Sequence, residues 1–282
     1  MWKDIAAKVL YYPIKWYNLI NIRKIYSEKK LKVTSKVELP LGKTLVISPH
    51  VDDETIGLGG LLDSNRANNR QVDLIYLTDS SGSKSNSFED TKTLREKEAR
   101  QLVTELNMGD LKILKAKNND VNPYTDEVVR ELHEFLSRKN YEKVFVVSPF
   151  DAHYEHRWTN NVFFKALNGG DFDFDIYLYE VSNLLPDEWI NTFHTFNGEK
   201  KKKIFDLFIS QKVAMDFDIF LQLNRFKGLP LGEKSFVELF SKLSVKEYKK
   251  LMESFSEEEI KEKLPRRIAN HRTFYKVLRD NK

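Results

Sequence analysis

Residues 44–60, TLVISPHVDDETIGLGG, contain a short apolar run, a polar loop and a glycine-rich segment in direct succession. The apolar run Thr44–Ser48 is typical of a buried strand, and Gly57–Gly60 lie near the start of an expected helix. In open α/β sheets, ligands gather beyond the carboxyl ends of the strands. The loop Pro49–Glu54 therefore lies where such a fold places its active site.

The same alternation of strands and helices continues toward residue 181. It predicts an α/β fold with a Rossmann-like, mainly parallel sheet flanked by helices. Beyond residue 199 the chain is charged and helical in pattern, which predicts a C-terminal helical extension of a domain that covers residues 41–282. The further strands are expected at 72–77, 111–114, 143–148 and 176–181, and the helices at 89–107, 125–138 and 158–167.

The composition limits the chemistry that the chain can carry. Its 282 residues include no cysteine, which excludes disulfides, thiolate metal sites and a cysteine nucleophile, and which fits a reducing cytoplasm. The net charge is only +4, and basic residues do not form a patch interleaved with aromatic residues, so we expect no nucleic-acid partner. Any metal site must use His, Asp and Glu. The sequence does not indicate an oligomeric state.

Residues 1–40 differ from the rest and predict an N-terminal helical segment. Within residues 1–30, tryptophans and aliphatic residues alternate with lysines and arginines at roughly helical spacing, and Pro13 is expected to kink this helix or to start a second one. One interpretation is an interfacial anchor that contacts the inner face of the membrane. The alternative is an additional helix packed on the domain. A span across the membrane is not expected, because no segment has the required length and apolarity.

A second cluster of chemically active side chains, DAHYEHR at residues 151–157, follows the expected strand 143–148. His153 and His156 are three residues apart, so both can face one side of a helix start. Three of the six histidines of the chain lie in this cluster and in the loop 49–54. Both clusters follow a strand, which predicts that they meet at one edge of the sheet.

Together the two clusters predict a catalytic metal site. The three carboxylates of residues 52–54 repel one another unless a cation lies among them, although acidic residues at a helix start are the alternative explanation. Two histidines, one carboxylate and an open position are usual for catalytic zinc, and another divalent metal such as Fe²⁺ is the alternative. A remaining carboxylate is then available as a general base, and a remaining histidine as an acid or oxyanion stabiliser.

With these two motifs the chain resembles the LmbE/PIG-L family of zinc-dependent N-acetylglucosaminyl deacetylases. That family typically carries Pro/Ala-His-Pro-Asp-Asp-Glu near its start and a His-x-Asp-His-type motif further along. The resemblance extends from about Lys43 to about Phe240. The chain departs from the pattern at Val51, where proline is usual, at Glu155, where aspartate is usual, and at Val121, where a glycine is frequent.

The resemblance implies a role for each residue of the two motifs. His50, Asp53 and His156 correspond to the zinc ligands. Asp52 corresponds to the general base, and His153 corresponds to the electrostatic stabiliser and general acid.

Three further residues acquire a role through the same resemblance. Arg95 and Asp120 fall where the family binds its substrate, although Arg95 can instead pair with Glu98 one helical turn later. Glu155 is expected to tune His153 without binding the metal itself.

The implied reaction is hydrolysis of an N-acetyl group on an amino sugar, with release of acetate and a free amine. An N-acetylglucosamine glycoconjugate or glycolipid is the expected substrate. The alternatives are an amidase for another amino-sugar conjugate, in low-molecular-weight thiol or antibiotic pathways, and a non-catalytic sugar-binding protein on the same fold.

Overall fold

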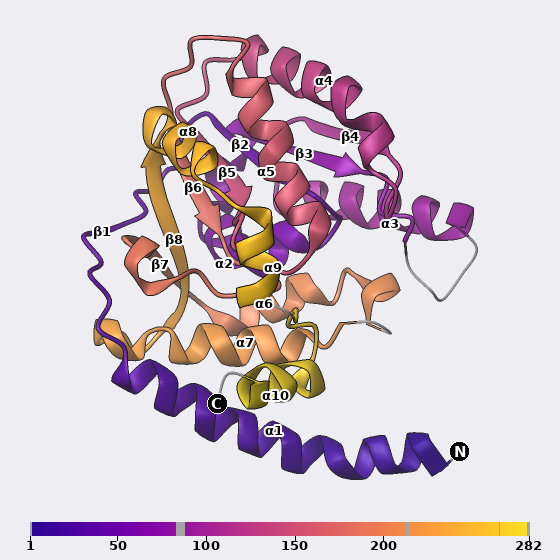
Figure 1. Ribbon diagram of the computed structural model, residues 1–282, viewed down its shortest axis with the longest axis vertical. Coiled ribbons are helices and arrows are strands. Elements are labelled where there is room, and N and C mark those ends of the chain that lie inside the picture. The colour runs from indigo at the N-terminus through magenta and orange to yellow at the C-terminus, as the bar shows by residue number, and fades with distance from the viewer. Residues whose placement is uncertain (1, 83–87, 213–214, 265, 281–282) are drawn as a thin grey trace.

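The computed structural model describes residues 2–82, 88–212, 215–264 and 266–280, without the side chains of 2–9, 88–89 and 280. Over these residues eight strands form one sheet, in the order β1-β7-β8-β6-β5-β2-β3-β4. Strand β8 is antiparallel to both of its neighbours, and all other neighbouring pairs are parallel. Helices flank this mostly parallel sheet (Figure 1), which confirms the predicted α/β, LmbE-like fold.

The elements have the following bounds. The strands are β1 (Ser35–Lys36), β2 (Thr44–Ser48), β3 (Val72–Thr78), β4 (Leu111–Ala116), β5 (Lys143–Val147), β6 (Asp175–Tyr179), β7 (Thr192–Phe196) and β8 (Phe236–Ser244). The α-helices are α1 (Trp2–Glu28), α2 (Asp53–Ser64), α3 (Phe88–Glu105), α4 (Thr125–Arg138), α5 (Tyr154–Leu167), α6 (Gly198–Phe205), α7 (Phe217–Phe226), α8 (Val245–Glu253), α9 (Glu257–Lys263) and α10 (His271–Asp280). The 3₁₀ helices are η1 (Arg66–Gln71), η2 (Asn122–Tyr124), η3 (Asp187–Trp189), η4 (Ile209–Gln211) and η5 (Leu229–Leu231).

The order of the strands determines where ligands can bind. From β2 the chain proceeds outward to β3 and β4, and it then returns to place β5 on the other side of β2. Because parallel crossovers are right-handed, the helices of the two halves cover opposite faces of the sheet. The loops after β2 and β5 therefore lie side by side at the point where the strand order reverses, which is the usual ligand site of such a sheet.

The central strands are buried on both faces. Leu45, Val46 and Ile47 of β2 are fully inaccessible to solvent, and every residue of β3 is buried. Each such aliphatic side chain contributes roughly 1.5–3 kcal/mol on burial. Helix α2 packs closely on this layer because a Cβ at Gly57 would lie 2.1 Å from the Tyr179 ring, and a Cβ at Gly60 would lie 2.3 Å from the Phe196 ring. The two glycines therefore bring the first turn of α2 close to the strand ends.

A buried ion pair supports a kink in α2. The backbone N–H groups of Gly60 and Leu61 donate to the Glu238 carboxylate at 2.8 and 2.9 Å. The Lys201 ammonium donates to the Ile56 carbonyl and to Glu238, each at 2.7 Å. Both charged side chains are fully buried. Charged groups thus replace the helical hydrogen bonds that are lost at the kink, which lies at Leu58. The first turn of α2 is therefore not collinear with the rest of the helix.

Two details of the chain differ from the expectations. Helix α5 begins at Tyr154 and not at residue 158, so His156 lies in its first turn. The helical pattern expected beyond residue 199 is wrong for residues 236–244, which form β8 inside the sheet. Glu238 in the middle of β8 interrupts the apolar run that identifies a buried strand. The sequence does not indicate that this glutamate is buried, because its partner Lys201 is far away along the chain.

The N-terminal segment forms one long helix with Pro13 inside it, which packs against α7 and α10 (Figure 1). Strand β1 follows and pairs with β7 at the edge of the sheet. Among the described residues, no helix has both the length and the apolarity that a bilayer crossing requires.

Candidate active site

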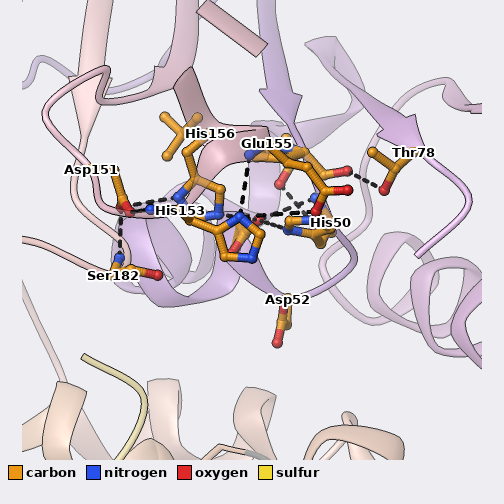
Figure 2. A network of polar contacts seen from close by, with 12 residues as sticks. His50, Asp52, Thr78, Asp151, His153, Glu155, His156 and Ser182 are labelled. Carbon is orange, nitrogen blue, oxygen red and sulfur yellow. Dashed lines mark hydrogen bonds and ion pairs between the residues drawn. The ribbon is translucent and has the colours of Figure 1, made fainter. Parts of the chain in front are cut away.

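The two predicted loops meet beyond the paired strands β2 and β5. Figure 2 shows His50 from the first loop facing His153 and His156 from the second. The rings of His50 and His156 are 5.6 Å apart, and His153 stacks on His156 with a centroid separation of 4.7 Å. Residues separated by a hundred positions in the chain thus form one polar cluster.

Three atoms of this cluster fit a metal ion. Oδ2 of Asp53 lies 2.9 Å from Nδ1 of His50 and 3.3 Å from Nε2 of His156. Ligand atoms of tetrahedral zinc are about 3.3 Å apart, since zinc–nitrogen and zinc–oxygen bonds are about 2.0–2.2 Å long. The donor set of two imidazoles and one carboxylate also matches a catalytic zinc site. The structure therefore brings together His50, Asp53 and His156, the three predicted ligands.

A carboxylate lies beside the far nitrogen of each ligand histidine. Oε2 of Glu155 lies 2.6 Å from Nε2 of His50, and Oδ2 of Asp151 lies 3.0 Å from Nδ1 of His156. Such carboxylate–histidine pairs orient the ring and select the tautomer that presents its other nitrogen to a metal. Glu155 was expected to tune His153, and its Oε2 lies 3.9 Å from Nδ1 of that ring. Its main partner is His50, because the longer glutamate arm reaches across to the first loop.

The charges of the cluster favour a cation. Burial opposes protonation of the two ligand histidines, but the carboxylates outweigh it: Asp53 and Glu155 raise the pKa of His50 to about 9. Asp151 and Asp53 likewise raise the pKa of His156 to about 10. Against the effect of burial, these two histidines hold the pKa of Asp53 well below its usual range. The site therefore requires positive charge, which either protons or a divalent metal can supply.

Asp52 occupies a strained position beside the ligands. Its φ of 128° lies far from the conformations that non-glycine residues prefer. It stands at the N-cap position of α2 but makes no side-chain capping bond, and no described residue donates a hydrogen bond to its carboxylate. Burial and the charge of Asp53 raise the pKa of Asp52, while Arg95 opposes this. Figure 2 shows its carboxylate apart from the network, which leaves it available as a base.

His153 lies at the front of the cluster, at the N-cap of α5. Its Nδ1 accepts the backbone N–H of Glu155 at 3.3 Å, so only Nε2 is free to act on a substrate. Burial and the neighbouring histidines hold the pKa of His153 well below its ordinary value, which favours the neutral ring over the protonated ring that a general acid needs. The ligand atoms of His50, His153 and His156 also lie within 4.8 Å of one another, which makes this trio a competing ligand set.

The two predicted substrate residues differ in their surroundings. Arg95 is buried and donates to the carbonyl of Val51 at 2.7 Å, next to Asp52. Glu98 instead accepts bonds from Ser210, at 2.8 Å from the backbone and 2.6 Å from the hydroxyl. Arg95 therefore supports the first loop, whatever it does for the substrate. Asp120 is exposed in the turn that follows β4, and its role stays a prediction.

The first loop compensates for the proline that it lacks. Val51 uses its backbone N–H, which proline does not have, to donate to the Ser80 hydroxyl at 3.0 Å. Its carbonyl accepts from Arg95 and from Gln211, the latter at 3.3 Å. Hydrogen bonds thus restrict this loop where the family pattern has a rigid ring.

Sequence reasoning missed three residues that contact the cluster. Asn118 donates to Glu155 at 2.6 Å and lies 3.1 Å from Nε2 of His50, and the backbone N–H of Asn119 donates to the other Glu155 oxygen at 2.6 Å. Asp151 accepts the backbone N–H groups of His153 and Ser182 in addition to contacting His156. Asp151 stood in the second motif, but the two asparagines carry no spacing signal toward a histidine of another loop.

Comparison with known proteins identifies this architecture. Residues 45–167, which contain both histidine loops, match the family model of PIG-L, described as GlcNAc-PI de-N-acetylase. The resemblance drawn from the two motifs is thereby confirmed for this part of the chain. No curated protein matches the sequence.

Several solved structures share the fold of most of this chain. N,N'-diacetylchitobiose deacetylase from Pyrococcus horikoshii aligns with a TM-score of 0.62 and 21% identity, over 80% of this chain and 91% of that one. GalB, the 4-carboxy-2-hydroxymuconate hydratase from Pseudomonas putida, gives 0.60 and 16%, over 71% and 96%. Teicoplanin deacetylase Orf2, in a zinc-inhibited form, gives 0.56 and 12%, over 71% and 98%. At these identities the likeness shows the fold alone, which a hydratase also uses.

Proposed function

We propose that the protein is a zinc-dependent N-deacetylase that acts on an amino sugar and releases acetate and a free amine. The carrying observation is the convergence of His50, Asp53 and His156, with a carboxylate behind each histidine. The PIG-L model and the deacetylases among the similar structures support this reaction class. An N-acetylglucosamine glycoconjugate or glycolipid is the substrate that we propose, and the cytoplasm is the proposed compartment.

In this mechanism the residues of the chain divide the proton transfers. When bound, a zinc ion would supply a Lewis acid that polarises the acetyl carbonyl. Asp52 accepts the proton of the attacking water, since its carboxylate has no hydrogen-bond partner among the described residues and its pKa is raised. His153 directs Nε2 toward the reacting carbonyl and stabilises the oxyanion. Asp52 then passes the proton of the water to His153, which delivers it to the leaving amine, so that Asp52 is again a carboxylate.

The supporting carboxylates keep this arrangement in place. Asp151 contacts His156 and also accepts the backbone N–H of His153, so one side chain orients both a ligand and the acid. Glu155 orients His50 from the opposite loop. Arg95, through the Val51 carbonyl, restrains the backbone that carries Asp52. Rigid support of this kind is what a metal hydrolase needs to keep its base at working distance.

A panel of N-acetylated amino sugars, with acetate release as the readout, tests the proposal. Zinc-loaded protein is expected to release acetate from at least one N-acetylglucosamine compound, and the chelated protein to release none. Release of a different acid from an amino-sugar conjugate would select the alternative amidase. Sugar binding without acetate release, or hydration of an unsaturated acid as in the hydratase, would overturn deacetylation.

A further inference from the structure

Helix α1 carries an apolar outer face that the rest of the molecule leaves uncovered. Of the eight large apolar side chains that are exposed among the described residues, Leu10, Tyr12, Trp16 and Ile20 lie on this one helix. Tyr12, Trp16 and Ile20 are 67%, 66% and 65% exposed and follow one another at intervals of four residues. Successive intervals of four residues advance only about 40° around a helix, so these three side chains form one stripe.

The opposite side of α1 is firmly attached to the body of the protein. Lys15 pairs with Asp218 at 2.7 Å, and Asn18 donates to the carbonyl of His271 at 2.7 Å. Ile22 and Tyr26 are buried in the core. Figure 1 accordingly shows α1 along the outer edge of the molecule, with α7 and α10 on one side of it. The three exposed side chains therefore face outward in the folded protein, and helix α1 can contact a partner without leaving the body of the protein.

The charges of α1 indicate what kind of partner this face fits. Arg23 and Lys24 are exposed and continue the stripe toward the C-terminal end of the helix. From Leu10 to Ser27 the helix carries no acidic residue, and Glu28, its last residue, is exposed one turn beyond Lys24. A second copy packed face to face would bring only Glu28 as a complementary charge within this range, whereas an anionic bilayer would present a whole layer of such charges. Tryptophan and tyrosine are also the side chains that favour the boundary between headgroups and acyl chains.

We propose that the outer face of α1 docks the protein on an anionic lipid bilayer. Trp16, Tyr12 and Ile20 insert at the headgroup boundary, and Arg23 and Lys24 contact anionic headgroups. The helix lies on the surface and does not cross it, consistent with its cations and with the fixed inner side. This proposal does not depend on deacetylation, so the two can fail separately.

Vesicle cosedimentation of the full chain tests the docking. The unaltered protein is expected to bind phosphatidylcholine vesicles that contain phosphatidylserine, and to bind pure phosphatidylcholine vesicles more weakly. Ile20→Glu should reduce the partition coefficient about tenfold, because a charge then replaces an inserted side chain. The matched control is Ile209→Glu, since Ile209 is 68% exposed but lies on η4 and not on α1. Arg23→Gln with Lys24→Gln should remove the preference for phosphatidylserine.

Two further measurements keep the result interpretable. Both isoleucine variants should keep the melting temperature of the parent, because the altered side chains are exposed, and should keep acetate release from a water-soluble substrate. Equal vesicle binding by Ile20→Glu and Ile209→Glu would overturn the proposal. So would absence of binding to either vesicle, or a dimer in sedimentation equilibrium that Ile20→Glu dissociates while lipid binding is absent.

Discussion

The loop after β2 and the loop after β5 each present one histidine to the proposed metal, but they hold it differently. His156 is supported within its own loop by Asp151. His50 is supported from outside, by Glu155 of the other loop and by Asn118 of the turn after β4. The second loop is thus self-contained and also orients the first. Damage to the second loop should therefore affect both ligands, whereas damage to the first should stay local.

Removal of a ligand from the self-contained loop should have the largest effect. His156→Ala is expected to lower zinc affinity by more than the roughly 100-fold that loss of a supporting partner costs, and to abolish acetate release. Zinc content after dialysis, measured by mass spectrometry, is the readout. The matched control is His133→Ala, on α4, which should keep its zinc. Full zinc occupancy in His156→Ala would refute the ligand set.

Within the first loop, Asp52 and Asp53 should separate chemistry from metal binding. Asp52→Asn is expected to lower kcat about 10²–10⁴-fold with zinc retained, because the amide cannot take up the proton of water. Asp53→Asn should instead lower zinc content. Parallel kinetics and metal analysis compare the two variants, and loss of zinc in Asp52→Asn would mean that the two aspartates have the opposite roles.

The supporting carboxylates test the asymmetry itself. Glu155→Gln and Asp151→Asn should each lower zinc affinity about 10–100-fold. Asp151→Asn should have the larger effect, since Asp151 also accepts the backbone N–H of His153 and so orients two histidines of the site, whereas the further bonds of Glu155 come from Asn118 and Asn119. Competition titration with a zinc chelator measures both affinities. A larger loss in Glu155→Gln would show that zinc affinity depends more on the support of His50 than on the support of His156.

The pH dependence of zinc binding has a definite sign. Zinc must displace the protons of His50 and His156, whose pKa values are about 9 and about 10. Affinity should therefore rise with pH, by about tenfold per unit and per proton, until pH passes those values. The folding stability of the metal-free protein should instead fall with pH. The raised pKa values of His50 and His156 in the folded state stabilise this protein fully below about pH 6.5. That stability is lost as pH rises through 9 and 10. Calorimetry in buffers of different ionisation enthalpy counts the released protons, and zinc affinity independent of pH would contradict the sign.

The sequence predicted those parts of the molecule whose signals are local. The strand Thr44–Ser48 is a short continuous apolar run, the helix Thr125–Arg138 has apolar residues at helical spacing, and each ligand loop directly follows a strand. Contacts between distant segments were not predictable. Strand β8 was missed because Glu238 is paired with Lys201, and the reach of Glu155 to His50 depends on how two loops pack.

Strain was invisible in the sequence for a similar reason. Asp52 looked like a capping residue or a base, and only its φ of 128° together with the missing capping bond separates the two roles. Strain of about 1–3 kcal/mol at a single residue persists only where the surroundings enforce it. Here Arg95 and Gln211 on the Val51 carbonyl, and Ser80 on its N–H, supply that restraint.

A crystal structure of the zinc-loaded protein, with anomalous data collected at the zinc absorption edge, tests the central claim most directly. The account predicts one strong peak at about 2.0–2.2 Å from Nδ1 of His50, Oδ2 of Asp53 and Nε2 of His156, with His153 and Asp52 outside bonding distance. A peak bound by His50, His153 and His156, with Asp53 free, would contradict it.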